Sequence, residues 1–219
     1  MAPTLRPRRS ALYLPGNQPR ALEKGKSLPA DVLIFDLEDA VGPDAKAESR
    51  ATVCEAVSSD SYRPREVVVR INGLDTDWHS DDLAAVAGSA ADGVLVPKVE
   101  TGQQVRALAD ALDTLGAPKS LQLWVMIETP RAFLRAEEVA SASERLAGLV
   151  VGTNDLVNEL HGLHVPGARP SSPRWAWPCW ARGRPEKSFW MACSTTSRMR
   201  ADSGPRRGTA AKWDSTARP

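Results

Sequence analysis

Short apolar runs recur along this 219-residue chain, and each is followed by helical sequence. The runs occupy residues 11–14, 32–35, 67–71, 93–96, 121–127 and 146–151. Runs without polar alternation, bounded by turn residues, indicate strands that are buried on both faces, as in parallel sheets covered by helices. Their spacing of roughly 20 to 30 residues predicts repeated strand–helix units.

Helix-start signals follow several of these runs. Thr129 and Pro130 supply an N-cap and a first-turn proline directly after Glu128, and the same strand-to-helix turn follows Gly152. Residues 101–104 form a capping box. Further helices are predicted up to residue 27, over 44–58 and from residue 80, so the chain alternates strand and helix throughout its first 165 residues.

This alternation fits either a (β/α)8 TIM barrel or a doubly wound sheet. In a barrel, side chains capable of chemistry follow most strands, whereas a doubly wound sheet gathers them at one switch point. Here such side chains follow most of the runs, and they are Asp36, Glu38, Arg70, Lys98, Glu128 and Asp155. Because a complete barrel needs about 250 residues, we predict a TIM barrel truncated to about six βα units, formed by residues 1–165.

Residues 166–219 follow a different pattern. They contain no Leu, Ile or Val, and five of the seven Trp lie there. Residues 170–219 hold 10 basic residues against 3 acidic ones, whereas residues 1–169 hold 18 against 24. A basic, Trp-bearing arm for nucleic acid is one interpretation, but the charges do not form runs. We therefore expect an irregular, disordered tail.

A reading-frame slip offers another explanation of this tail. When each codon's third base is read with the first two of the next codon, the bases for residues 189–201 permit LDGVFNDVKDA, and those for residues 174–187 permit LGLAVLGARAAGK. Both are well-formed helix or strand sequences. The hypothesis is a one-base slip between about residues 167 and 174, and sequencing the gene would decide it.

The remaining composition indicates a cytoplasmic protein. No run of about 18 apolar residues exists, and the first 16 residues lack the apolar centre of a signal peptide. The three cysteines, Cys54, Cys179 and Cys193, are too few and too scattered for a disulfide framework or a zinc site. We expect them to be reduced.

Two carboxylates occupy equivalent positions in successive units, since Glu128 and Asp155 each follow an apolar run. If the two strands are parallel neighbours, both side chains emerge at the same rim, where hard oxygen ligands suit Mg²⁺ or Mn²⁺. The simpler interpretation is that Asp155 is a helix N-terminal acid and Glu128 a solvated loop acid.

Six motifs in order resemble one known family: RSALYLPGN, DVLIFDLEDAV, VVVRIN, GVLVPKVE, MIETPRAF and GTNDL, spread from residue 9 to residue 156. They are similar to the citrate lyase beta-subunit-like branch of the HpcH/HpaI aldolase and citrate lyase family, the acyl-CoA ester lyases. The resemblance implies a TIM barrel, a Mg²⁺ ion, a trimeric or hexameric homo-oligomer, and cleavage or formation of a carbon–carbon bond in citryl-, citramalyl- or malyl-CoA.

The resemblance also implies roles for the strand-end residues. Glu128 and Asp155 match the family's metal ligands, and Arg70 matches its substrate-carboxylate contact, which makes Arg70 and Glu128 the expected catalytic and substrate-binding residues. Arg70 is always charged and can hold a carboxylate with two donors. Its alternative role is to pair with a neighbouring acid inside the rim.

Three further acids, Asp36, Glu38 and Asp39, are expected to hold Arg70 and metal-bound waters in place. Lys98 could face the phosphates of CoA or only solvent. The missing last third of the family pattern makes the activity of the chain as translated doubtful.

The leading functional hypothesis is thus a Mg²⁺-dependent acyl-CoA lyase, with no nucleic-acid or membrane partner. The first alternative is an aldolase of the same superfamily that acts on free 2-oxo acids such as pyruvate. The second is a catalytically dead scaffold or subunit.

Overall fold

The computed structural model describes residues 8–161 and 188–192. These residues contain seven strands in one parallel sheet, arranged in sequence order. They are β1 (Ala11–Pro15), β2 (Val32–Asp36), β3 (Glu66–Arg70), β4 (Gly93–Val96), β5 (Gln122–Ile127), β6 (Leu146–Gly152) and β7 (Ser188–Ala192). In a doubly wound sheet the strand order reverses at a switch point, and the order of this sheet does not reverse. The predicted truncated barrel is therefore confirmed.

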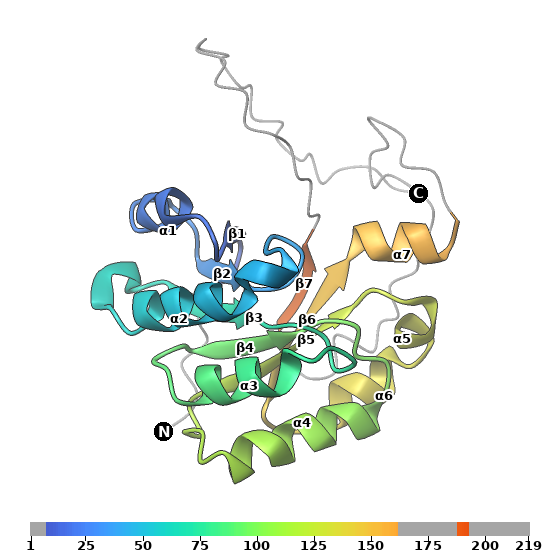
Figure 1. Cartoon of the computed structure of the whole chain (residues 1–219). Helices are drawn as coiled ribbons and strands as arrows, with labels where there is room; N and C mark the ends of the chain where they lie inside the picture. The colour runs from blue at the N-terminus through green and yellow to red at the C-terminus, as the bar shows by residue number, and fades with distance from the viewer. Residues whose placement is uncertain (1–7, 162–187, 193–219) are drawn as a thin grey trace, which may run out of the picture.

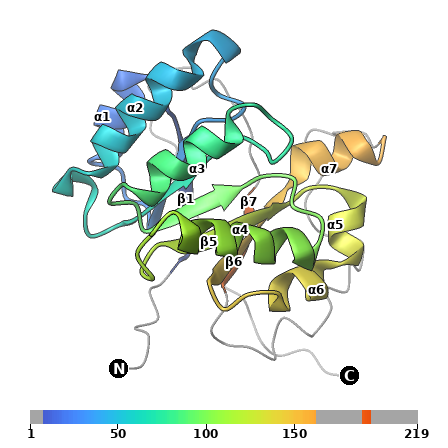
Figure 2. The same ribbon diagram turned by 60° about the horizontal axis from the view of Figure 1, so that its bottom comes forward.

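Helices cover the outside of the curled sheet, forming an arc around it in Figure 1. They are α1 (Pro19–Gly25), α2 (Lys46–Val57), α3 (His79–Ala87), α4 (Gly102–Thr114), α5 (Pro130–Leu134), α6 (Ala136–Ser141) and α7 (Thr153–Glu159), with 3-10 turns η1 (Pro43–Ala45) and η2 (Asp60–Tyr62). Figure 2 shows that α2, α3 and α4 follow one another over the same face of the sheet. The predicted capping box forms at Thr101 and Gln104, and Thr129 caps α5 through its side chain.

The strands bury both faces, as their uninterrupted apolar sequences predict. Side chains on the outer face join the helices in the main core, for example Phe35, Val69 and Val125. Side chains on the inner face form a second cluster inside the curl, and its members are Val32, Ile34, Val68, Leu95, Trp124, Met126, Ala147 and Val150. The inner cluster closes the interior below the strand ends, so only the residues beyond it can meet a ligand there.

Strand β7 corrects one expectation about the tail. The composition of residues 166–219 predicts an irregular tail, yet Ser188–Ala192 pairs in parallel with Gly148–Gly152 of β6. Aromatic residues also favour strands, and the free edge of β6 offers unpaired backbone groups to any extended segment. The rest of the predicted tail, including Cys179 and Cys193, lies outside the described residues.

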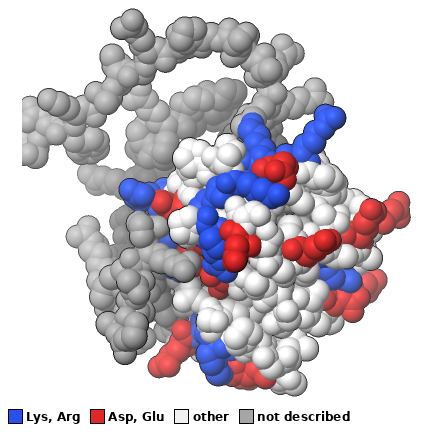
Figure 3. Space-filling view, turned by 90° about the vertical axis from the view of Figure 1, so that its left-hand side faces the viewer, with Lys and Arg blue, Asp and Glu red and all other residues white. Residues whose placement is uncertain are grey.

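The surface of the described ranges carries mixed charge. On the face drawn in Figure 3, acidic and basic side chains lie next to each other over α1, α2 and α3. None of the helices in these ranges is long and apolar enough to cross a bilayer. Cys54, the one cysteine in the described part of the chain, is free.

Candidate active site

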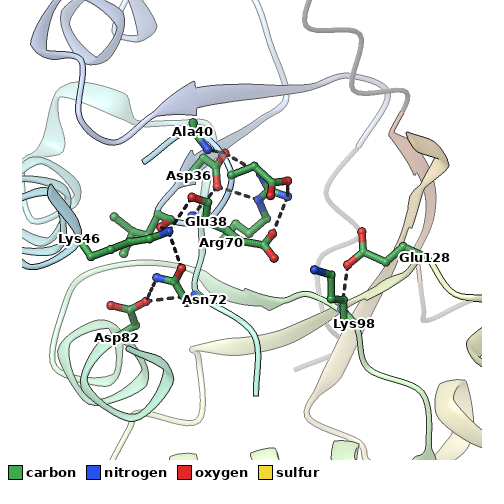
Figure 4. Close-up of polar contacts among 11 residues, drawn as sticks. Asp36, Glu38, Ala40, Lys46, Arg70, Asn72, Asp82, Lys98 and Glu128 are labelled. Carbon is green, nitrogen blue, oxygen red and sulfur yellow. Dashed lines mark hydrogen bonds and ion pairs between the residues drawn. The ribbon is translucent and has the colours of Figure 1, made fainter. Parts of the chain in front are cut away.

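The carboxyl ends of the strands bring the predicted residues to one edge of the sheet. Asp36 ends β2 and Arg70 ends β3, and the two residues pair directly in the register of these strands. Glu128 follows the last residue of β5, two positions after the inward-facing Met126. Since side chains alternate along a strand, Glu128 shares the inner face. Figure 4 shows these side chains at one mouth of the curled sheet.

Arg70 is buried within a group of three acids. Its Nε and Nη2 donate to Oδ1 and Oδ2 of Asp36 at 2.7 and 2.6 Å, and its Nη1 lies 2.8 Å from Glu38 Oε2 and 3.1 Å from Asp39 Oδ2. Burial acts against the charge of Arg70, but the hydrogen bonds and charge of Asp36, with Glu38, raise its pKa. The alternative role considered for Arg70, pairing inside the rim, is thus realised with both Asp36 and Glu38.

The loop after β2 is held by the same aspartate. The backbone N–H groups of Glu38 and Ala40 donate to the Asp36 carboxylate at 2.9 and 3.3 Å. This carboxylate therefore ties its own loop to Arg70. Burial raises the pKa of Glu38 to about 7, the nearby Arg70 opposes the shift, and Asp39 adds to it.

Glu128 is buried rather than solvated, which excludes the loop-acid interpretation. It is 1% exposed, and its Oε1 accepts a hydrogen bond from the backbone N–H of Lys98 at 2.9 Å. Asp155, in the first turn of α7, lies close enough to interact with the Glu128 carboxyl group. Burial raises the pKa of Glu128 to about 8, and the contact with Asp155 and the charge of Glu38 add to the shift. The two acids therefore share a rim, as expected.

A glycine makes this arrangement possible. A Cβ atom at Gly152 would lie 2.3 Å from Oε2 and 2.7 Å from Cβ of Glu128. Such contacts are shorter than any van der Waals separation, so a side chain at residue 152 would force Glu128 out of its present position. The last residue of β6 thus provides the space in which the buried glutamate sits.

In Figure 4, Lys98 lies between Glu128 on one side and the acids around Arg70, Asp36 and Glu38, on the other. Its backbone adopts a positive φ of 54°, which is uncommon for a residue other than glycine. This conformation accompanies the hydrogen bond from its N–H to Glu128. Partial burial opposes the charge on its side chain, but Glu38, Asp155 and Glu128 together raise its pKa.

A buried network behind the mouth was not predicted. Lys46 of α2 donates from Nζ to the carbonyl oxygens of Leu37 and Glu38 and to Asn72 Oδ1, at 2.8, 2.7 and 2.6 Å. Asn72 in turn donates from Nδ2 to Asp82 at 2.5 Å. These bonds fix the loop that carries Glu38 against the end of β3. The only available signal was the polar Asn72 after that strand.

The residues at this mouth fit a hard divalent cation. The carboxyl groups of Glu128 and Asp155 lie close enough to interact, and burial of Glu128, together with this interaction, raises its pKa. No group of three or more metal-binding side chains of the His, Cys, Asp and Glu types occurs in the described ranges. Mg²⁺ commonly takes only one or two protein carboxylates and fills its other positions with water and substrate oxygens. The pair is therefore adequate as the protein's share of a magnesium site.

Comparison with known proteins agrees with this geometry. The family model described as HpcH/HpaI aldolase/citrate lyase matches residues 9–169. The chain belongs to this family. The assignment confirms the resemblance drawn from the six motifs, and the family match ends within the region where the frame slip was placed.

Among curated relatives, the (3S)-malyl-CoA thioesterase of Cereibacter sphaeroides (strain ATCC 17025 / ATH 2.4.3) is 47% identical over 166 residues, which are 76% of this chain and 56% of that protein. Citrate lyase subunit beta of Escherichia coli K12 is 39% identical over 74% of this chain and 55% of its own length. This family member thus spans about half the length of the curated relatives it matches.

A solved structure shows the same fold. The citrate lyase beta subunit of M. tuberculosis, in complex with oxaloacetate and magnesium, superposes with a TM-score of 0.58 and 31% identity, covering 74% of this chain and 66% of that one. The related protein thus binds both a magnesium ion and a 2-oxo acid.

Proposed function

We propose that this chain carries the metal and substrate site of a Mg²⁺-dependent carbon–carbon lyase acting on 3-hydroxyacyl-CoA esters of the malyl, citramalyl or citryl type. The observation that carries the proposal is the interaction between the Glu128 and Asp155 carboxyl groups. Glu128 lies at the mouth that also holds Arg70 (Figure 4). Family membership and the lyase names of several relatives support it.

The reaction defines what the site must do. In the cleavage direction the substrate hydroxyl loses its proton, and the bond between its carbon and the carbon next to the thioester breaks. The electron pair forms a thioester enolate, which takes up a proton to give the shorter acyl-CoA, and a 2-oxo acid is released. A magnesium ion, when bound, would supply a positive charge beside the developing negative oxygen.

The described residues divide these tasks. Glu128 and Asp155 would hold the cation, and the Lys98 N–H keeps one oxygen of Glu128 in place. Arg70 would attract the substrate carboxylate, with Asp36, Glu38 and Asp39 setting its orientation and the positions of waters around the ion. The cytoplasmic location and the trimeric or hexameric assembly stay predictions.

A second candidate is hydrolysis of the thioester. It is favoured by one observation, the 47% identity to a protein named (3S)-malyl-CoA thioesterase. The two reactions give different products from malyl-CoA: lyase cleavage gives glyoxylate and acetyl-CoA, whereas hydrolysis gives malate and free CoA.

The decisive experiment is an assay of the full chain on malyl-CoA, with and without Mg²⁺, that measures glyoxylate and free thiol separately. The lyase proposal expects Mg²⁺-dependent glyoxylate, abolished by Glu128→Gln. Glu137→Gln, on the exposed side of α6, is the matched control and should leave the rate unchanged. Free thiol without glyoxylate would favour the thioesterase, and glyoxylate production by Glu128→Gln at the normal rate would contradict the site.

A further inference from the structure

Tyr13 of β1 reaches the same mouth from the edge of the sheet. Its ring packs against the inner cluster, beside residues of β2. The guanidinium carbon of Arg70 lies 5.2 Å from the centre of this ring. The ring therefore forms part of the surface on which Arg70 rests, two strands away from its own.

The hydroxyl of Tyr13 is buried without a hydrogen-bond partner. Within the described ranges, only Tyr13 Oη and Trp124 Nε1 are buried side-chain polar atoms of this kind. Most buried polar groups have partners, and leaving one unpaired is unfavourable because the group has lost its hydrogen bonds to water. Trp124 lies deep in the inner cluster, but Tyr13 stands next to charged residues of the site. An unpaired donor at that position indicates a partner that binds from outside the chain.

The chain's own residues leave an incoming acid few donors on Arg70. A guanidinium has five N–H groups, and here Nε and Nη2 bind Asp36 while Nη1 binds Glu38 and Asp39. These contacts leave about one N–H group of Arg70 for a substrate carboxylate. To be held by two donors, the carboxylate would have to displace one of these acids or bind a second donor nearby. The Tyr13 hydroxyl, beside the same guanidinium, is such a donor.

The charges around Tyr13 suit a donor role. Burial raises the pKa of its phenol, Arg70 opposes the shift, and the carboxylates of Asp36, Glu128 and Glu38 add to it. The hydroxyl thus keeps its proton at neutral pH. A neutral donor can bind an anionic oxygen without adding charge to the mouth.

We propose that the Tyr13 hydroxyl donates a hydrogen bond to an oxygen of the small 2-oxo acid held at this mouth, and so acts as a substrate-binding residue beside Arg70. The inference rests on the proposed function, because it needs an acid bound next to the Glu128 and Asp155 carboxylates. It adds to that function a substrate contact from β1, which lies four strands away from β5, the strand that Glu128 follows.

The test compares Tyr13→Phe with Tyr62→Phe in the full chain. Tyr13→Phe keeps the ring beside Arg70 and removes only the unpaired oxygen. Tyr62 is the matched control, since its buried hydroxyl donates to the Leu22 carbonyl at 3.2 Å and its ring meets Phe35 edge-on, away from the mouth.

Calorimetric titration with oxaloacetate in the presence of Mg²⁺ should show a dissociation constant about tenfold higher for Tyr13→Phe, as expected for losing a hydrogen bond to a charged group. The melting temperature of the ligand-free protein should not fall, because no internal partner is lost. Tyr62→Phe should show the reverse pattern, with a lower melting temperature and an unchanged dissociation constant.

Three results would overturn the inference. Equal oxaloacetate affinity of Tyr13→Phe and wild type would refute it while leaving the proposed function intact. A Tyr13→Phe protein that melts lower than wild type, or does not fold, would show that the hydroxyl has a structural partner. A wild-type chain that binds neither oxaloacetate nor glyoxylate would contradict the proposed function and the inference together.

Discussion

Glu128 is the residue whose environment most needs a bound cation. It is almost fully buried, and apart from one backbone N–H its polar neighbour is another acid. Burying a carboxylate is unfavourable unless it is paired. In the metal-free chain this penalty raises the pKa of Glu128 to about 8, so a proton takes the place that a cation would fill.

The stabilisation by Mg²⁺ should therefore depend on pH. Since the pKa of Glu128 rises from 4.5 to about 8 on folding, the metal-free protein loses stability as the pH rises through this range. Mg²⁺ must displace the proton, so its affinity should rise by about tenfold per pH unit up to about pH 8. The increase in melting temperature on adding Mg²⁺ should grow from pH 6 to pH 8 and then level off.

A series of thermal melts between pH 6 and pH 9, with and without Mg²⁺, measures this effect. In Glu128→Gln the dependence on pH should disappear together with most of the stabilisation. An increase in melting temperature that is constant across the series would mean that no buried acid titrates when the ion binds.

Some of the site could be predicted residue by residue, and some could not. The placement of Asp36, Arg70, Glu128 and Asp155 at one edge could be predicted, because each follows an apolar run and parallel strands bring such positions together. Lys46 and Tyr13 gave no such signal. In the sequence, one is an ordinary helix lysine and the other an ordinary strand aromatic, and their roles depend on which residues the fold places beside them.

At the level of elements, β4, β5 and β6 pack around one large side chain. Trp124 of β5 is fully buried in the inner cluster. A Cβ atom on Gly93 of β4 would lie 3.0 Å from its Nε1, and one on Gly148 of β6 would lie 2.9 Å from its Cε3. Glycines on the two neighbouring strands thus provide the space for the indole beneath the site.

Gly148→Ala should destabilise the fold by about 1–3 kcal/mol, the usual effect of overpacking a rigid core. Gly42→Ala is the matched control, because a Cβ there meets nothing within 4 Å and its φ of −68° suits alanine. Chemical denaturation measures both free energies of unfolding. Equal values for the two variants would show that the indole can move aside without loss.

The elements themselves followed closely from the sequence. The capping box at the start of α4 and the proline in the first turn of α5 are local sequence signals. They predict where these helices begin without knowledge of tertiary packing. Strand β7 was missed for the opposite reason. Its pairing depends on the free edge of β6, and an edge is a property of the sheet that composition does not reveal.

At the level of the whole molecule, the sequential strand order makes a curled sheet with one mouth, and the family match extends over residues 9–169. The sequential strand order could be predicted because acidic and basic residues follow most strands, whereas a doubly wound sheet would gather them at one pair of strands. The assembly is expected only from the family resemblance, because oligomeric contacts leave no periodic signal in the sequence. The chain covers 54–56% of several curated relatives, which agrees with a barrel that lacks its last units.

The most direct test of the shared cation site is a Mn²⁺ titration of the full chain followed by electron paramagnetic resonance. Wild type should bind one ion per chain, and Glu128→Gln and Asp155→Asn should each bind it at least about tenfold more weakly, because each removes one of two charged ligands. Glu137→Gln should match wild type. Undiminished binding by both Glu128→Gln and Asp155→Asn would contradict a cation held between these two carboxylates.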